Sequence, residues 1–197
     1  TWVFQLSADE KKIYIGLSDG SRPNAIYEYD IATGSSYELA KISDLDDVAA
    51  NENFITGYDS WDSRGNFHIA SFSMYDGDNA YMLGINPVRI KAAKGLLDEL
   101  VEVNVEDSGS DIRIARSGIA MESLEVLYEI RGYSSTNDWV ATSHGEVTLA
   151  ANQTSLSLNP NGLSQPSDSA VASTQFWLIA DGNDYILAEK RSVGLGN

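Results

Sequence analysis

Residues 12–34 read KIYIGLSDGSRPNAIYEYDIATG, and this stretch decides the fold that we expect for the first part of the chain. Apolar side chains recur at every second position over 12–18 and again over 25–31, the pattern of half-buried β-strands. The segment between the strands has the Asp, Gly, Ser and Pro content of a loop, and Thr33 and Gly34 close the second strand with a tight turn. The stretch therefore predicts two strands joined by a polar loop.

The same pattern recurs along most of the chain. Turn-forming residues at 63–66, a hairpin turn at 76–79 and a long polar loop at 159–169 separate the apolar runs. Short strands at this spacing, with Gly-rich turns between them, predict an all-β fold. The further strands are expected at 2–6, 36–42, 54–58, 66–73, 80–86, 101–106, 111–116, 124–131, 145–150, 154–158, 174–180 and 185–190.

One short helix is expected at 87–99. Pro87 suits the first helical turn, where its missing N–H has no hydrogen bond to lose. Apolar residues then recur at helical spacing, although Gly95 interrupts the pattern. We expect this helix to link two modules, residues 1–99 and residues 100–197.

Charge and composition exclude several classes of function. The chain has 197 residues, a net charge of −16 and no cysteine. Such acidity predicts repulsion of nucleic acid and anionic lipid, and the lack of cysteine excludes disulfides, thiolate metal sites and cysteine nucleophiles. No apolar run of about 18 residues is present, so no membrane-spanning helix is expected. The chain begins in mid-strand at Trp2, and we expect it to be a piece of a longer protein.

Residues 12–34 combine a strand, a polar loop, a second strand and a D-x-x-T-G turn. Residues 55–62 (ITGYDSWD) and 65–72 (GNFHIASF) then place a second turn before another strand. This arrangement resembles the blades of a β-propeller, and residues 1–86 hold about two units of blade size. A propeller closes its ring with about four or more blades. The resemblance implies that further blades are missing or come from another chain; the alternative is an open sheet.

Five segments of the second half follow one another in a characteristic order and spacing. Together they resemble a Calx-β domain, an immunoglobulin-like β-sandwich, over residues 103–190. The segments are 105–107 (VED), 116–118 (RSG), 124–130 (LEVLYEI), 134–139 (SSTNDW) and 145–154 (GEVTLAANQT).

The resemblance to Calx-β domains implies a calcium site, because calcium-binding members gather acidic side chains at one end of the sandwich. Glu106 and Asp138 stand at matching positions, and Asp168 is the remaining candidate for the third acidic element. The family pattern of paired Asp followed by E-x-x-E-x-F is not kept, since residues 167–176 read SDSAVASTQF. The alternative is a structural sandwich without calcium. No other cofactor is expected.

The sequence contains no complete catalytic set. Its two histidines belong to different modules, with His68 in an expected strand and His144 in an expected turn, which argues against a shared catalytic or metal site. Trp139 and Trp177 are expected to fill the sandwich core.

The best ligand-binding candidate is the segment YDSWD at 58–62. Tyr58 and Trp61 offer aromatic platforms, and Asp59 and Asp62 offer hydrogen-bonding carboxylates, a combination that suits a sugar ring. The alternative is a capped strand end, in which the indole packs and the carboxylates hold a turn.

These observations favour a non-enzymatic binding or structural module that is extracellular or at the cell surface. We expect its partners to be other protein chains, among them the missing propeller blades, or polysaccharide. The alternative function is that of a fragment of a secreted carbohydrate-active propeller enzyme, whose catalytic cleft lies mostly outside this chain.

Overall fold

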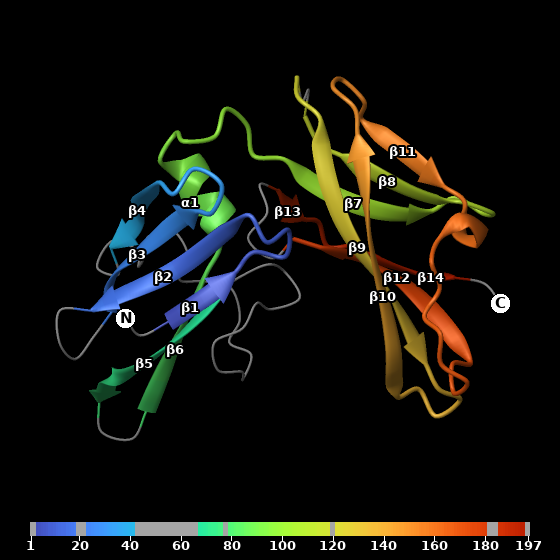
Figure 1. Ribbon diagram of the computed structural model, residues 1–197, viewed down its shortest axis with the longest axis horizontal. Coiled ribbons are helices and arrows are strands. Elements are labelled where there is room, and N and C mark those ends of the chain that lie inside the picture. The colour runs from blue at the N-terminus through green and yellow to red at the C-terminus, as the bar shows by residue number, and fades with distance from the viewer. Residues whose placement is uncertain are drawn as a thin grey trace. The chain divides into compact units, whose positions relative to one another are not determined.

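The structure is a computed structural model that describes residues 3–18, 23–41, 67–76, 79–118, 121–180 and 185–195. Its fold is all-β with one short α-helix, which confirms the fold class expected from the apolar pattern (Figure 1). The residues described up to Leu100 form one compact unit, and those described from Val101 onward form a second. No helix in these ranges is long and apolar enough to cross a membrane.

The first unit contains a four-stranded antiparallel sheet whose strand order follows the sequence. Its strands are β1 (Val3–Leu6), β2 (Lys12–Ser18), β3 (Pro23–Asp30) and β4 (Ser36–Lys41). Strands β5 (Phe67–Asp76) and β6 (Asn79–Ile85) pair separately as a hairpin. The strand expected at 54–58 and the turn expected at 63–66 lie outside the described residues.

The D-x-x-T-G motif forms the turn between β3 and β4. The carboxylate of Asp30 accepts hydrogen bonds from the backbone N–H of Thr33 (2.7 Å) and from its hydroxyl (2.8 Å). These two donors, the backbone N–H first, lower the pKa of Asp30. Gly34 follows at a φ of 70°, a left-handed conformation that glycine adopts without strain, and donates to Asp30 O over 2.9 Å.

Helix α1 (Pro87–Ala93) begins at the expected residue but ends at Ala93 rather than at residue 99. Gly95 has a φ of 67°, and its N–H donates to the carbonyl of Ala92 (3.0 Å). The N–H of Leu96 reaches back to the carbonyl of Lys91 (2.9 Å). These two bonds form a Schellman C-cap, so Gly95 stops the helix rather than merely weakening it.

A buried ion pair joins α1 to the sheet of the first unit. Lys91 Nζ lies 3.1 Å from Glu28 Oε2 of β3, and both side chains are almost fully buried. The hydroxyl of Tyr37 in β4 donates to the other oxygen of the same carboxylate over 3.0 Å. Because a buried charge without a partner is costly, this contact ties the helix to its sheet.

The second unit is built from two four-stranded sheets, ordered β10-β9-β12-β14 and β11-β8-β7-β13. All strand pairs are antiparallel except β13 with β7. The strands are β7 (Glu102–Asp107), β8 (Ile112–Arg116), β9 (Leu124–Tyr133), β10 (Trp139–Leu149), β11 (Ser155–Leu158), β12 (Ser173–Ile179), β13 (Ile186–Leu187) and β14 (Ser192–Leu195).

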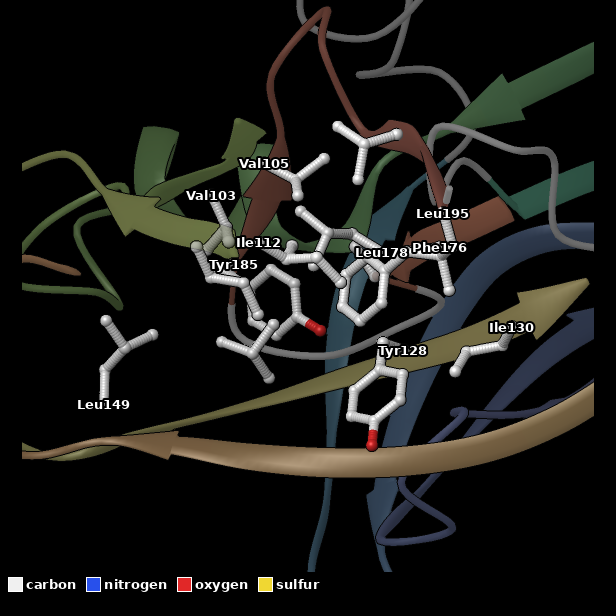
Figure 2. Close-up of a cluster of buried hydrophobic side chains, with 14 residues drawn as sticks. Val103, Val105, Ile112, Tyr128, Ile130, Leu149, Phe176, Leu178, Tyr185 and Leu195 are labelled. Carbon is white, nitrogen blue, oxygen red and sulfur yellow. The ribbon is translucent and has the colours of Figure 1, made fainter. Parts of the chain in front are cut away.

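Both sheets contribute to one apolar core, the arrangement of a two-layer sandwich (Figure 2). Tyr128 of β9 stacks on Phe176 of β12 with ring centroids 4.8 Å apart, and burial raises the pKa of the Tyr128 hydroxyl. The other buried side chains of this core include Val103, Val105, Ile112, Ile114, Val126, Ile130, Leu149, Leu178, Tyr185, Val193 and Leu195.

Strand β10 is longer than expected. It begins at Trp139, whereas the sequence predicted a strand only over 145–150 and a turn around His144. His144 instead lies within the strand, opposite Glu129 of β9. A glycine at position 145 is also typical of a turn, but here it lies in a strand, where an added Cβ would collide with the Tyr128 hydroxyl. Glycine is therefore required here by the close approach of an aromatic ring.

The end of the chain also differs from expectation, because two short strands, β13 and β14, replace the single strand predicted at 185–190. The long loop expected at 159–169 holds only the 3₁₀ turn Pro160–Gly162. Part of this loop packs on the sandwich, since a Cβ built on Gly132 would meet Pro166 at 3.2 Å and Val171 at 2.6 Å.

Arg116 is a buried charge at the end of β8. Its guanidinium donates to three backbone carbonyls, those of Gln153 (2.8 Å), Glu122 (3.0 Å) and Ala150 (2.9 Å). These carbonyls lie in the segment before β9 and in the connection between β10 and β11. One side chain thus holds the connections of both sheets together.

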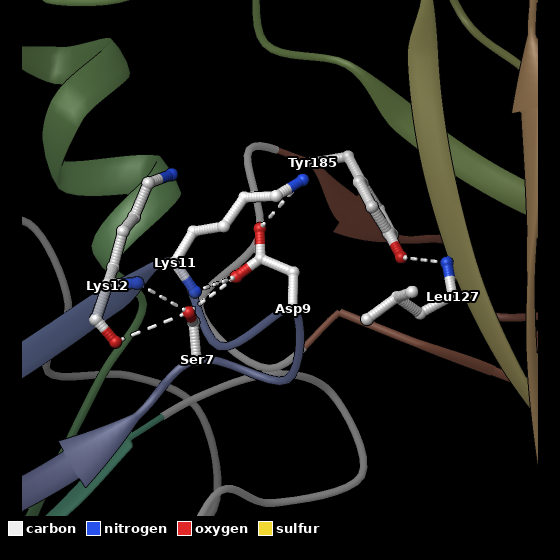
Figure 3. Close-up of polar contacts among 6 residues, drawn as sticks. All are labelled: Ser7, Asp9, Lys11, Lys12, Leu127 and Tyr185. Atoms are coloured by element: carbon white, nitrogen blue, oxygen red, sulfur yellow. Dashed lines mark hydrogen bonds and ion pairs between the residues drawn. The ribbon is translucent and has the colours of Figure 1, made fainter. Parts of the chain in front are cut away.

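The hydroxyl of Tyr185 joins β9 to β12. It accepts a hydrogen bond from the N–H of Leu127 (3.1 Å, Figure 3) and donates one to the carbonyl of Ile179. Leu127 and Ile179 are register partners in the two strands. The hydroxyl therefore connects two backbone groups of paired residues through a side chain.

Candidate functional site

A β-bulge decides the direction of Trp139. Trp139 pairs with Tyr133 and Ala141 pairs with Gly132, so Val140 is an extra residue in β10. Strict alternation would place Trp139 on the inner face with Ala141, but the bulge turns it to the outer face. Trp139 is 59% exposed. The prediction that it fills the sandwich core is therefore wrong.

Trp177 also lies on the outer face, because its neighbour Phe176 points into the core. It is only partly buried, so the prediction of a core position is wrong for this residue too. Between the two indoles lies the guanidinium of Arg131. Its Cζ is 4.9 Å from the ring centroid of Trp139 and 4.2 Å from that of Trp177. These three side chains, a cation–π stack, are named here the tryptophan–arginine ladder.

The charge of Arg131 is balanced by Glu129, which lies beside the ladder. Its Nε and Nη2 both contact Oε1 of Glu129, two residues earlier on the same face of β9. Glu129 is buried and lies opposite Trp177 in the sheet register. Because Arg131 is already paired, its role is to position the two indoles rather than to attract an anion.

The indole of Trp139 is held in place by hydrogen bonds from its ring nitrogen. Its Nε1 donates to the hydroxyl of Thr142 (2.7 Å) and is 3.1 Å from the carbonyl of Ala141. With Arg131 stacked against the ring, these contacts fix the side chain although it is largely exposed. A ring held in this way loses little conformational entropy when a ligand stacks on it.

The turn directly before Trp139 in the sequence carries several polar groups. The hydroxyl of Ser134 accepts from the N–H of Asp138 (3.1 Å), and the hydroxyl of Thr136 donates to Asp138 Oδ2 (2.6 Å). Asn137 has a φ of 64°, which is tolerated better by Asn than by most residues. Asn137 and Asp138 are both exposed. The turn thus fixes a carboxylate and exposes an amide in the two residues that precede Trp139.

The three residues expected to bind calcium lie on separate segments. Glu106 of β7 is 3.3 Å from Arg113 of β8, and Asp168 accepts from the N–H of Ala170 (2.7 Å). Asp138 is held by the turn before β10. Across the described ranges, no group of three or more Asp, Glu, His or Cys side chains is placed to hold a metal ion. A calcium site at these positions stays a prediction.

The predicted sugar-binding segment, with Tyr58, Asp59, Trp61 and Asp62, lies outside the described residues and also stays a prediction. His68 lies in β5 opposite Gly84. The aromatic site found in the second unit was missed because both tryptophans were assigned to the core. The signal for it was the polar turn that runs directly into Trp139.

Comparison of the chain with protein-family models, with curated proteins and with solved structures finds no match. The outer face of the sheet β10-β9-β12-β14 therefore has to indicate its function through its own geometry.

Proposed function

We propose that this chain is a non-enzymatic binding module of an extracellular or cell-surface protein. It engages polysaccharide or other protein chains through the tryptophan–arginine ladder. The observation that carries the proposal is Trp139, a large aromatic side chain that is exposed yet held by a stacked guanidinium and two hydrogen-bonding contacts. Fixed exposed aromatic rings are common anchors of binding sites.

The finer assignment proposed for the second unit is a Calx-β-like sandwich. The two four-stranded sheets with a shared core support it. For the first unit we propose propeller-blade character, supported by four antiparallel strands in sequential order and by the D-x-x-T-G turn at Asp30. Under this proposal, missing blades are partners of the first unit, and adhesion through the second unit is the biological role.

The second candidate function is a fragment of a secreted carbohydrate-active propeller enzyme. The sequential strand order of β1 to β4 favours it, because propeller blades are four-stranded sheets. Glycan hydrolysis by a longer version of the protein tests this alternative. If the activity is lost on substitution of Asp59 or Asp62, the protein is an enzyme rather than a binding module.

Binding measurements on the full chain test the leading proposal. Wild type and the Trp139→Ala variant are compared by co-sedimentation with insoluble polysaccharides and by biolayer interferometry with neighbouring domains of the same protein. Met121→Ala is the matched control, since Met121 is an exposed apolar side chain (80%) of the same unit. We expect Trp139→Ala to weaken binding at least tenfold and Met121→Ala to leave it unchanged. Equal binding by both variants and wild type would exclude the ladder as the binding site.

A further inference from the structure

The indole of Trp139 is stacked on Arg131 and is otherwise largely exposed, so it can receive a ligand. Arg131 occupies one face, with its Cζ 4.9 Å from the ring centroid. A flat ligand can therefore stack on a single side of a ring whose orientation is fixed by Thr142 and Ala141. The face of an aromatic ring is electron-rich, and it attracts the weakly positive C–H groups on the flat side of a sugar ring.

The adjoining turn supplies hydrogen-bonding groups of the kind that sugar hydroxyls need. The carboxylate of Asp138 uses one of its roughly four acceptor positions for Thr136, and the side chain is otherwise exposed. Hydroxyl groups that donate to a carboxylate form charge-assisted bonds, which are about twice as strong as neutral ones. Asn137 offers an amide that both donates and accepts, and it directly precedes this carboxylate.

Charge decides between neutral and anionic sugars. Asp138 carries a negative charge one residue from the stacking ring, and the whole chain has a net charge of −16. The cation nearest the ring, Arg131, is already paired with the buried Glu129. A carboxylate or sulfate on a ligand stacked on Trp139 would therefore be repelled by Asp138; Arg191, a second cation, lies against Trp177 instead, with its Cζ 6.0 Å from that ring centroid.

We infer that the ligand of the ladder is an uncharged polysaccharide, one of whose pyranose rings stacks on Trp139 while its neighbouring hydroxyls bond to Asp138 and Asn137. This inference rests on the proposed function and names the ligand class of that same face. It gives Asp138 a role in ligand binding that is independent of calcium.

The test uses the full chain in affinity electrophoresis and isothermal titration calorimetry. Probes are two soluble neutral polysaccharides, a β-glucan and a galactomannan, and two anionic ones, polygalacturonate and heparin, all with and without a calcium chelator. Variants are Trp139→Ala, Trp139→Phe and Asp138→Asn. Glu189→Gln is the matched control, because Glu189 is another exposed carboxylate of the same unit and has no predicted ligand. Amide spectra of each variant verify that it is folded.

A neutral probe should bind with chelator present, with at least a tenfold loss for Trp139→Ala and a smaller loss for Trp139→Phe. Asp138→Asn should weaken neutral binding severalfold and reduce the discrimination against polygalacturonate, whereas Glu189→Gln should change neither. Saturation-transfer NMR should show protein contact to the ring C–H protons.

Three results would overturn the inference. The first is that neither neutral polysaccharide binds. The second is that a neutral probe binds without dependence on Trp139 and Asp138. The third is that an anionic polysaccharide or a protein chain binds through Trp139 in preference to neutral sugars; the proposed function would then stand while the ligand class would be wrong. If no glycan and no protein needs Trp139, both fail.

Discussion

Replacement of Arg116 by methionine should destabilise the second unit by about 3 kcal/mol. Methionine keeps much of the apolar stem but removes the donors to the carbonyls of Gln153, Glu122 and Ala150. Hydrogen bonds from a charged donor contribute about 1.5 to 3 kcal/mol each. The desolvation of a buried guanidinium offsets several kcal/mol of that gain. The net loss is therefore about the value of one or two such bonds.

Arg113→Met is the matched control for this prediction, because both arginines belong to β8. Arg113 is exposed, and its ion pair with Glu106 spans 3.3 Å at the surface. Exposed ion pairs contribute about 0 to 1 kcal/mol. Urea unfolding of the full chain, followed through amide NMR signals of β8 and β9, reports the free energy of unfolding of this unit. A loss below about 1 kcal/mol for Arg116→Met, or a loss equal to that of Arg113→Met, would refute the reasoning.

Three further predictions concern packing, pH and the buried ion pair. Gly145→Val should destabilise the second unit by roughly 2 to 3 kcal/mol, since its Cβ would overlap the Tyr128 ring; calorimetric melting measures this. The carboxyl of Asp30 should titrate by NMR below its ordinary pKa of 3.8, so its contribution to stability is present above about pH 4 and is lost as the pH falls through the lowered pKa. Lys91→Met should cost the first unit about 3 to 5 kcal/mol in urea unfolding, because it leaves Glu28 buried without its cation.

Each of these predictions has its own control. Gly194→Ala in β14 should be nearly neutral, because no atom lies within 4 Å of the added Cβ; equal losses at both glycines would contradict the packing argument. Thr33→Val removes the hydroxyl donor but keeps the backbone N–H, so it should bring the pKa of Asp30 only part of the way back toward its ordinary value; an unchanged midpoint would show that the hydroxyl does not contribute. The double variant Lys91→Met with Glu28→Leu should recover much of the stability lost by Lys91→Met alone; no recovery would exclude the unpaired charge as the reason.

The local sequence pattern was enough to predict strands in which apolar and polar side chains alternate regularly. Strands β2 and β3 lie within two residues of their predicted bounds, because their apolar residues alternate regularly and turn-forming residues bound them. The start of α1 was predictable from Pro87. The end of α1 was not predictable from the sequence, because an isolated glycine can also be tolerated inside a helix. Only the structure shows that Gly95 has the left-handed conformation that stops it.

The ladder was not predictable by the same reasoning. A large aromatic residue of a β-sandwich favours the core, and no strand was predicted at Trp139. The bulge at Val140 that turns its side chain outward depends on how β10 pairs with β9. The first half of β10 also lacks a strand pattern, since Ser143 and Gly145 occupy inward positions that usually hold larger apolar side chains. Gly145 is explained only by Tyr128 across the sheet, a contact that no local window of sequence contains.

The hydroxyl of Tyr185 has a consequence for the order of assembly. The Tyr185 hydroxyl bonds to Leu127 of β9 and Ile179 of β12, and Tyr185 is synthesised after both strands. A nascent chain that ends before Tyr185 contains both strands but lacks the two hydrogen bonds by which this hydroxyl connects them.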